Sequence, residues 1–239
     1  GGGRTVPAFV AAAGGELREI SVTGPVGDPV SARYGLLPGG RGVIEMAAAS
    51  GLPLVPQDRQ NPEHTTTYGT GELIADALDA GCRELLIGVG GSATNDGGIG
   101  MAEALGYRFL DEGDGACGHD GEALREIAPL ATGSVDPRIS ESRVVVACDV
   151  HNPLYGRTGA AFVYGPQKGA DQEMVVRLDE GLRNLSRVIG RDLGVAVDEL
   201  PGAGAAGGLG AGLVAFCGAE LESGIDAVLD LVRFDEMLE

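Results

Sequence analysis

A buried-strand signal that runs directly into a glycine-dense loop is the feature that most constrains this chain. Residues 85–89 are apolar and predict a strand, residues 90–98 include four glycines, and residues 100–105 predict a helix. Glycine lets a backbone turn tightly and brings its N–H groups close to a ligand. A helix start adds free N–H donors and partial positive charge. We therefore predict a strand–loop–helix unit whose loop binds a phosphate or a carboxylate.

Alternating strand and helix signals place the whole chain in the α/β class. We predict strands at residues 16–22, 30–37, 42–46, 85–89, 107–111, 143–148 and 160–164. We predict helices at residues 5–13, 71–80, 100–105, 171–190, 213–218 and 224–232. The first three strands follow one another closely and indicate an antiparallel or mixed patch. The expected architecture is a mixed or parallel sheet flanked by helices.

Composition excludes several classes of partner. The formal net charge is −18 at pH 7, which argues against nucleic acid and anionic membranes as partners. No apolar run is long enough to cross a bilayer, and the four cysteines lie far apart without a Cys-x-x-Cys pair. These observations predict a cytoplasmic protein with free thiols.

The strong negative charge also constrains how this chain could bind a phosphorylated ligand. Local N–H donors, a metal ion or a few well-placed cations must offset the repulsion. Lys168 is the only lysine among 17 basic residues, and it lies in a loop that contains glycine, proline and glutamine. It is present either for its compact ammonium group or by accident on a solvated turn. Composition leaves both interpretations open.

A second candidate site follows the predicted strand at residues 143–148. Asp149 lies at the carboxyl end of that strand, the edge at which open α/β sheets bind ligands. Asp149 and Asn152 supply hard oxygens that suit a magnesium ion shared with substrate phosphates. The alternative is an aspartate-initiated turn before Pro153, which the pattern taken alone favours.

Two further segments carry candidate ligands. The hydroxyl groups of residues 65–70 could cap the predicted helix, with Thr70 the expected cap, or could hold a small polyol acid. Capping explains one threonine but not the series, so Thr67 is a candidate substrate ligand. Glu45 ends a predicted strand and is a candidate buried carboxylate. The alternative for Glu45 is an acid on the surface at the end of a strand.

Residues 88–93 also match the dinucleotide pattern G-x-G-x-x-[GA], and Asp111 falls where a ribose-binding acid would lie. The match is weak because residues 95–98 intrude where a Rossmann helix should already be under way. A phosphate-binding P-loop is excluded, since no Gly-Lys-Ser or Gly-Lys-Thr follows the glycines.

Six segments, taken in order, resemble the bacterial glycerate kinase family, whose members phosphorylate D-glycerate with ATP, commonly at the 2-hydroxyl. The segments are residues 43–51, 66–74, 87–98, 147–154, 162–170 and 201–212. They span nearly the whole chain in collinear order. The resemblance implies a two-domain α/β kinase that uses ATP and Mg²⁺. Residues 16–220 would form most of its main domain, and residues 1–15 and 221–239 would lead into a truncated second domain.

Two departures from the family pattern concern the ends of the chain. Family members usually begin earlier, with a lysine-bearing Ser-Phe-Lys-Gly stretch and then Gly-Gly-Glu-Gly-Thr, and Gly3 stands here at the glutamate position. They also continue past the equivalent of Glu239 into a Thr-Gly-Glu-Gly segment. We therefore expect a central fragment of a longer enzyme that is inactive, or nearly so, when tested alone.

The kinase hypothesis is in-line transfer of the γ-phosphoryl group of MgATP to a glycerate hydroxyl in a cleft between two domains. The residues expected to bind anions are Gly90, Gly91, Ser92, Thr94 and Asn95. Either Asp96 or Asp149 would hold the metal or take the hydroxyl proton, and Lys168 would neutralise phosphate charge or bind the glycerate carboxylate.

Two other hypotheses remain beside the kinase. One is a nicotinamide-dependent oxidoreductase built on residues 88–93, and the other is a non-catalytic module that binds small anions. The kinase hypothesis requires Ser92, Asp149 and Lys168 to converge on one pocket.

Overall fold

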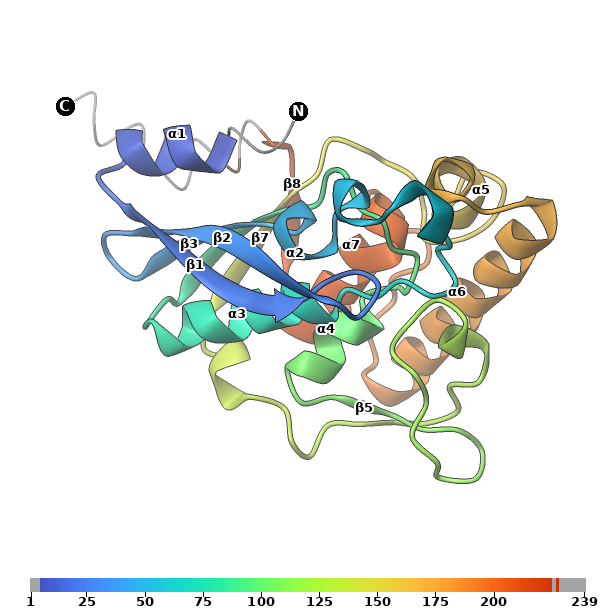
Figure 1. The fold of residues 1–239 in the computed structure, drawn as a ribbon. Coiled ribbons are helices and arrows are strands. Elements are labelled where there is room, and N and C mark those ends of the chain that lie inside the picture. Colours follow the sequence, from blue (N-terminus) through green and yellow to red (C-terminus); the bar gives the residue numbers. More distant parts are fainter. Residues whose placement is uncertain (1–4, 225–226, 228–239) are drawn as a thin grey trace.

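A six-stranded mixed sheet forms the centre of the computed structural model, which describes residues 5–224 and residue 227 (Figure 1). The strands, in spatial order, are β1 (Glu16–Thr23), β2 (Pro29–Leu37), β3 (Arg41–Glu45), β4 (Glu84–Gly88), β7 (Arg143–Ala147) and β8 (Glu220–Glu222). The first three strands pair antiparallel, whereas β3, β4, β7 and β8 run parallel. This arrangement confirms the α/β class and the mixed sheet.

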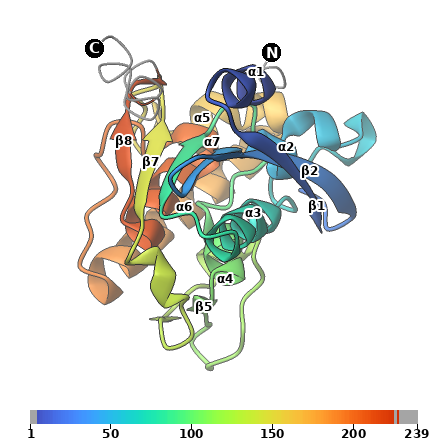
Figure 2. The same cartoon turned by 90° about the vertical axis from the view of Figure 1, so that its left-hand side faces the viewer.

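Helices cover both faces of the sheet. They are α1 (Thr5–Ala12), α2 (Ala47–Ser50), α3 (Tyr68–Asp79), α4 (Ile99–Ala104), α5 (Ala160–Tyr164), α6 (Gln172–Asp192) and α7 (Ala205–Cys217). Alternate residues of a strand point to opposite faces. Ile44, Ile87 and Val146 therefore belong to the main core, with side chains of α3, α4 and α7. In the same three strands, the residue just before each of these points to the opposite face. These residues form a second core cluster with α1, which lies on that other side of the sheet (Figures 1 and 2).

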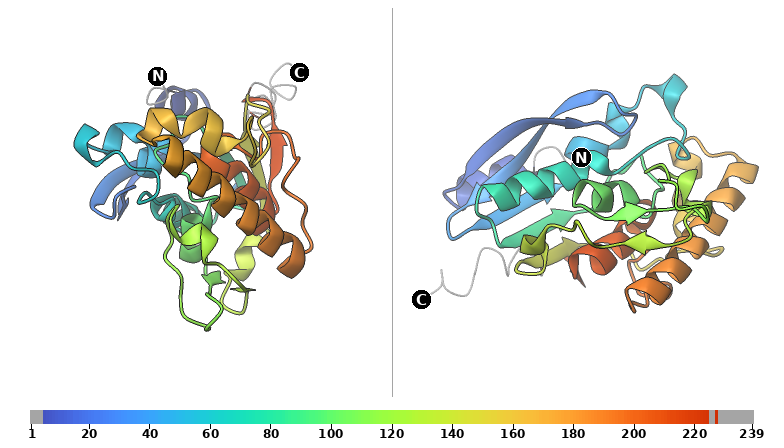
Figure 3. Two further views of the ribbon diagram at one scale, coloured as in Figure 1. Left: turned by 90° about the vertical axis from the view of Figure 1, so that its right-hand side faces the viewer. Right: turned by 90° about the horizontal axis from the view of Figure 1, so that it is seen from below.

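The longest helix, α6, runs along the outside of the molecule (Figure 3). Asp171 caps it by accepting a hydrogen bond from the Met174 N–H at 2.8 Å. Leucines at positions 178, 182 and 185 are buried and follow the spacing of one helix face. None of the described helices combines the length and hydropathy that crossing a lipid bilayer requires.

The second glycine-rich segment contains a kink near the start of α7. Three consecutive residues near the start of α7 adopt positive φ angles: 52° at Ala206, 71° at Gly207 and 92° at Gly208. The regular part of α7 therefore begins after Gly208. A Cβ on Gly207 would lie 2.0 Å from the Thr94 carbonyl oxygen, so this turn packs directly against the first glycine loop.

Several predicted elements differ from the structure. Residues 160–164, predicted as a strand, form α5, because a short apolar run does not distinguish a strand from a buried helix turn. The strand predicted at residues 107–111 shrinks to β5 (Arg108–Phe109), which pairs with β6 (Leu130–Ala131) outside the main sheet. The helix predicted at residues 213–218 is the end of α7, and β8 had not been predicted.

Two further predictions concern the ends of elements and of the chain. Thr70 does not cap a helix, because α3 already begins at Tyr68. The helix predicted at residues 224–232 lies outside the described residues except for 224 and 227. The division into a main domain at residues 16–220 with flanking stubs stays a prediction.

Candidate functional site

A cavity of about 290 Å³, the strand-end cavity, opens at the carboxyl ends of β4 and β7. Because these neighbouring strands are parallel, with Gly88 opposite Ala147, the loops that follow them emerge at the same edge of the sheet. Residues 89–92 and 147–150 form part of the wall, and the other lining residues are Tyr164, Gln167, Lys168, Ala205 and Ala206. Ser92, Asp149 and Lys168 thus converge on one cavity, as the kinase hypothesis requires.

Lys168 is the most unusual group in this cavity. Its side chain is only 2% exposed, which excludes the interpretation as a solvated turn residue. The Nζ atom donates to Ser92 Oγ at 2.7 Å and to the Thr94 carbonyl at 2.6 Å. Burial lowers the pKa of Lys168 to about 7, and the nearby Asp96 partly opposes this shift. Because an ammonium group has three donors, one remains for a ligand.

A tight turn holds Lys168 in place. The residue ends a short 3-10 helix, Pro166–Lys168, and Gly169 follows with a φ of 101°. A Cβ on Gly169 would lie 2.3 Å from the Gln60 carbonyl oxygen, so only glycine fits there. The loop composition recognised in the sequence therefore reflects how the chain buries one ammonium group.

Asp149 is the carboxylate that lines the cavity. Its side chain is exposed, and Oδ1 accepts a hydrogen bond from the Gly224 N–H at 2.9 Å. Asn152 lies just beyond: its Nδ2 donates to the Thr158 carbonyl at 2.8 Å, and its Oδ1 accepts from the Tyr164 hydroxyl at 2.7 Å. Asn152 therefore orients Tyr164, which itself faces the cavity.

Asp96 lies beneath the glycine loop and is not among the residues that line the cavity. It is fully buried, and its carboxylate accepts from the Thr67 N–H and the Thr67 hydroxyl, both at 2.7 Å. It also accepts from the Gly98 N–H at 3.1 Å. Burial raises the pKa of Asp96, whereas these hydrogen bonds act to lower it. In this position the carboxylate fixes the loop to the start of α3.

The threonine series before α3 serves the same purpose. Thr65 donates to the Ala93 carbonyl at 3.0 Å, and Thr66 donates to the His119 carbonyl at 2.7 Å. Thr67 bridges Asp96 and the Met101 N–H, and the Thr70 hydroxyl lies 2.9 Å from that of Ser50. Each hydroxyl joins a different segment, which accounts for a series that capping alone could not explain.

The other predicted ligands occupy three kinds of position. Gly90 and Gly91 line the cavity, and Gly91 has a φ of 76°. Thr94 and Asn95 lie outside the lining and are fully buried, with Thr94 Oγ1 and both polar atoms of the Asn95 amide lacking a hydrogen-bond partner among the described residues. Glu45, at the end of β3, is half-buried, and burial raises its pKa.

Several cavity residues had no assigned role in the sequence. Among them are Cys148, Tyr164, Gln167, Ala205 and Ala206. The alanines carried a signal, because they lie in the second glycine-rich segment. Tyr164 lies in residues 162–170, another of the segments that resemble the family, but residues 160–164 were predicted as a strand, so its position at the cavity was not expected.

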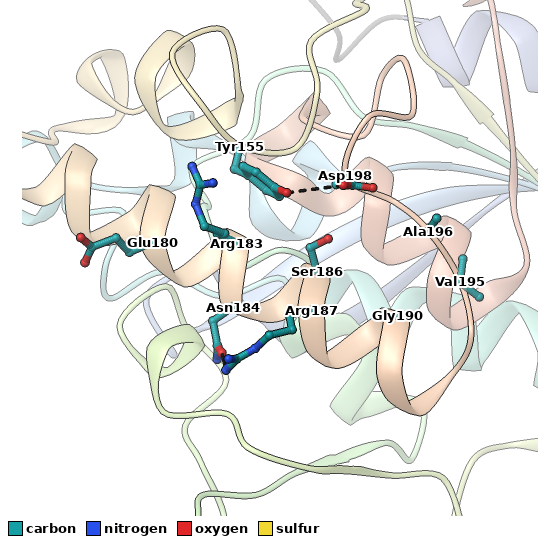
Figure 4. Close-up of a pocket in the computed structure, with 10 residues that line it drawn as sticks. All are labelled: Tyr155, Glu180, Arg183, Asn184, Ser186, Arg187, Gly190, Val195, Ala196 and Asp198. Carbon is teal, nitrogen blue, oxygen red and sulfur yellow. Dashed lines mark hydrogen bonds between the residues drawn. The ribbon is translucent and has the colours of Figure 1, made fainter.

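A second, larger cavity of about 600 Å³, the α6 cavity, lies along α6 (Figure 4). The Arg183 guanidinium is 4.4 Å from the Tyr155 ring centre, and the Tyr155 hydroxyl donates to Asp198 at 3.5 Å. Arg187 follows Arg183 by one helical turn and donates to the Asn184 side-chain oxygen at 2.7 Å. None of the residues predicted as ligands lines this cavity.

The structure does not support Asp111 as the ribose-binding acid of a dinucleotide site. Asp111 accepts hydrogen bonds from the Gly113 and Gly115 N–H groups, both at 2.8 Å, in a turn after β5. A ribose-binding acid should end the neighbouring parallel strand, but β5 does not join the main sheet. The proposed role of Asp111 is therefore wrong.

Known proteins match this chain over its full length. The model of the glycerate kinase family matches residues 1–239. A glycerate kinase from Halalkalibacterium halodurans is 52% identical over 100% of the chain and 63% of its own length. A glycerate 2-kinase from Escherichia coli is 48% identical over 99% of the chain and 62% of its own length.

A solved structure agrees with these matches. The crystal structure of a glycerate kinase 2 from Salmonella typhimurium superposes with a TM-score of 0.96 at 49% identity. The superposition covers 98% of this chain and 63% of the chain in that crystal structure. The chain therefore spans less than two thirds of the length of these relatives.

Proposed function

The chain belongs to the glycerate kinase family, and we propose that the protein transfers the γ-phosphoryl group of ATP to D-glycerate. The observation that carries this proposal is the convergence of Ser92, Asp149 and Lys168, from three distant segments, on one cavity at the ends of parallel strands. Phosphoryl transfer needs positioned donors and neutralised charge more than covalent help from the protein. A cavity with one buried cation and a glycine loop supplies both.

In this proposal Lys168 and Ser92 bind an anionic oxygen of the substrates together. Ser92 Oγ accepts a hydrogen bond from Lys168, so its own hydrogen is free to be donated into the cavity. Lys168, which has a third N–H to donate, lines the same space as Gly90 and Gly91. A charge-assisted donor is roughly twice as strong as a neutral one. This set can offset the repulsion that the net charge of −18 imposes on a phosphate.

We assign different roles to the two candidate carboxylates. Asp149 would hold the Mg²⁺ that accompanies ATP. Its exposed hard oxygens fit an ion that proteins often bind through one or two carboxylates and substrate phosphates. In the described part of the chain no group of three or more His, Cys, Asp or Glu side chains could hold a metal alone. That ion would supply charge neutralisation at the phosphates. Asp96, which lies beneath the glycine loop, would act by holding that loop in place.

We further propose that the 2-hydroxyl is the acceptor, which makes 2-phosphoglycerate the product, and that the reaction takes place in the cytoplasm. The 48% identity to a glycerate 2-kinase supports this choice of hydroxyl. The described cysteines are free thiols, in line with a reducing compartment.

The decisive test is release of ADP from ATP in the presence of D-glycerate. We would assay this chain beside a version extended at both ends to the length of its relatives. Enolase added to the product mixture dehydrates 2-phosphoglycerate directly, whereas 3-phosphoglycerate reacts only after a mutase is also added. Glycerate-dependent ADP release is expected from the extended form and little or none from this chain alone, so the kinetic experiments below use the extended form. Its absence from both forms, together with calorimetric binding of NAD(H), would favour the oxidoreductase.

A further inference from the structure

Ala206 holds a backbone conformation that alanine normally avoids. Its φ and ψ angles are 52° and 39°. Ala206 and Asp114 are the non-glycine residues with positive φ in the described part of the chain. Alanine is strained in this region because its Cβ comes too close to the following carbonyl oxygen. Glycine would be free of this strain, and the surrounding segment is rich in glycine.

Packing prevents the backbone at Ala206 from relaxing. The Gly97 N–H donates to the Gly207 carbonyl at 3.1 Å, which ties the turn to the first glycine loop. A Cβ on Gly208 would lie 2.9 Å from Gly97 Cα, so the two backbones are in direct contact. The Thr94 carbonyl, against which Gly207 packs, also accepts a hydrogen bond from Lys168. The same contacts that position Lys168 therefore hold Ala206 in its left-handed conformation.

The methyl group of Ala206 is the part that glycine would lack. Ala206 lines the strand-end cavity together with Ser92, Asp149 and Lys168, and 9% of the residue remains exposed. Backbone strain persists where the surrounding structure enforces it, and it gathers at ligand sites. A strained alanine that faces the cavity is explained if the methyl group itself contacts the ligand.

We propose that Ala206 is a specificity-determining residue whose methyl group limits the cavity to a three-carbon hydroxy acid. This inference rests on the proposed function, because it assumes that the acid acceptor occupies the strand-end cavity. The ligands that the methyl group would exclude are longer aldonic acids, which carry the same carboxylate and 2-hydroxyl. The cost of this selection is the strain at position 206.

The first test is Ala206→Gly, measured by thermal unfolding and by kinetics with two acids. Relief of strain should exceed the entropy that glycine adds to the unfolded chain. We expect Tm to rise by about 2 °C. The ratio of kcat/KM for D-erythronate to that for D-glycerate should rise about tenfold, the usual effect of one carbon in a pocket.

Two further variants separate strain from cavity size. Asparagine tolerates the left-handed region but has a larger side chain. Ala206→Asn should therefore keep Tm within about 2 °C of the parent value and should reduce kcat/KM for both acids at least about tenfold. Asp114→Gly removes the other positive-φ side chain in an exposed turn. It should leave the ratio between the acids unchanged.

The outcomes distinguish this inference from the proposed function. If the parent protein releases ADP with D-glycerate but Ala206→Gly leaves the ratio between the acids unchanged, the specificity role is wrong and the kinase proposal stands. A lower Tm in Ala206→Gly would contradict the strain argument, whatever the kinetics. If the extended parent protein does not phosphorylate glycerate, both proposals fail.

Discussion

The strand-end cavity and the α6 cavity both contain basic side chains, but the positive charge is buried in the first and exposed to solvent in the second. Along α6, Arg183 is 60% exposed, stacks on Tyr155 and lies 3.5 Å from Asp179. At the strand ends, Lys168 is buried, and among the described residues it donates only to neutral oxygens, those of Ser92 and Thr94. The α6 cavity has about 600 Å³ against about 290 Å³ at the strand ends, so volume does not identify the better candidate site.

The physical difference lies in solvation. An exposed arginine with nearby acids is already neutralised by water and by its neighbours, so an anion gains little by binding to it. A buried ammonium group without a contacting carboxylate has lost its water and lacks an ion-pair partner. Groups of this kind gather at functional sites. Each of the following experiments sets one cavity against the other.

Lys168→Met should produce the largest difference between the two cavities. Loss of one preorganised donor typically lowers kcat by about 10²–10³-fold. The matched variant, Arg183→Met, removes a cation from the α6 cavity and should change kcat by less than about twofold. Steady-state ADP release with D-glycerate measures both. Near-normal turnover in Lys168→Met would remove this residue from the site.

Thr67→Val tests the support beneath the strand-end cavity. The change removes the hydroxyl that donates to Asp96 and accepts from the Met101 N–H. Leaving a buried carboxylate short of a donor should lower the free energy of unfolding by about 1–3 kcal/mol. Ser186→Ala, in the wall of the α6 cavity, should stay within about 0.5 kcal/mol of the parent. Denaturant unfolding of both variants measures the contrast, and equal losses would mean that Asp96 has no special dependence on Thr67.

The pH dependence of substrate affinity above pH 7 should be carried by Lys168. Its folded-state pKa is about 7, so the ammonium form is lost as pH rises above 7. Affinity for glycerate should then fall about tenfold per pH unit. The contribution of Lys168 to stability should change in the opposite direction. Because the unfolded lysine titrates near its ordinary value of 10.5, Lys168 binds fewer protons in the folded state between pH 7 and 10.5, and its own contribution to stability rises across that window. The cysteines, whose pKa burial raises, act against this rise because the unfolded thiols lose their protons first.

Calorimetric titrations and unfolding curves across this pH range measure both trends. Lys168→Met should abolish the affinity trend, and the stability of the parent relative to this variant should rise between pH 7 and 10.5. Arg183→Met should behave like the parent in both measurements. Affinity independent of pH in the parent protein would show that the ammonium group does not contact the anion.

The smallest expected effect is that of Arg183→Met on stability. This variant loses the cation–π contact with Tyr155 and a long ion pair with Asp179. The Arg183 side chain is solvent-exposed, and the buried Asp179 keeps its hydrogen bond from the Gly156 N–H, so we expect a loss of about 0.5–1 kcal/mol in the free energy of unfolding. A loss several times larger would mean that the α6 cavity is a more rigid structure than its exposure indicates.

Much of the fold could be predicted from local patterns. The strands at Glu16–Thr23 and Arg143–Ala147 and the helix at Gln172–Asp192 follow from alternation, apolar runs and the 3.6-residue period. Residues 160–164 could not be assigned in this way, because five apolar residues suit a strand and a buried helix turn equally. The three residues Glu220–Glu222 form a strand only because β7 offers an unpaired edge.

The candidate site could be predicted as a set of segments but not as a set of contacts. The sequence identified Ser92, Asp149 and Lys168, and these line the cavity. It grouped Asp96 and Thr67 with them, although these two bind one another beneath the loop. It assigned no role to Ala206, because a left-handed alanine has no signature in sequence.

By itself, the sequence determined where the backbone turns and which residue types lie there, because glycine content and hydrophobic period act over a few neighbouring residues. Only the tertiary structure decided which polar groups face the cavity and which are consumed in holding it together. That choice depends on partners far along the chain, such as Lys168 with Ser92 and Thr67 with Asp96. A buried polar group must find its hydrogen bonds wherever the fold brings a partner within reach.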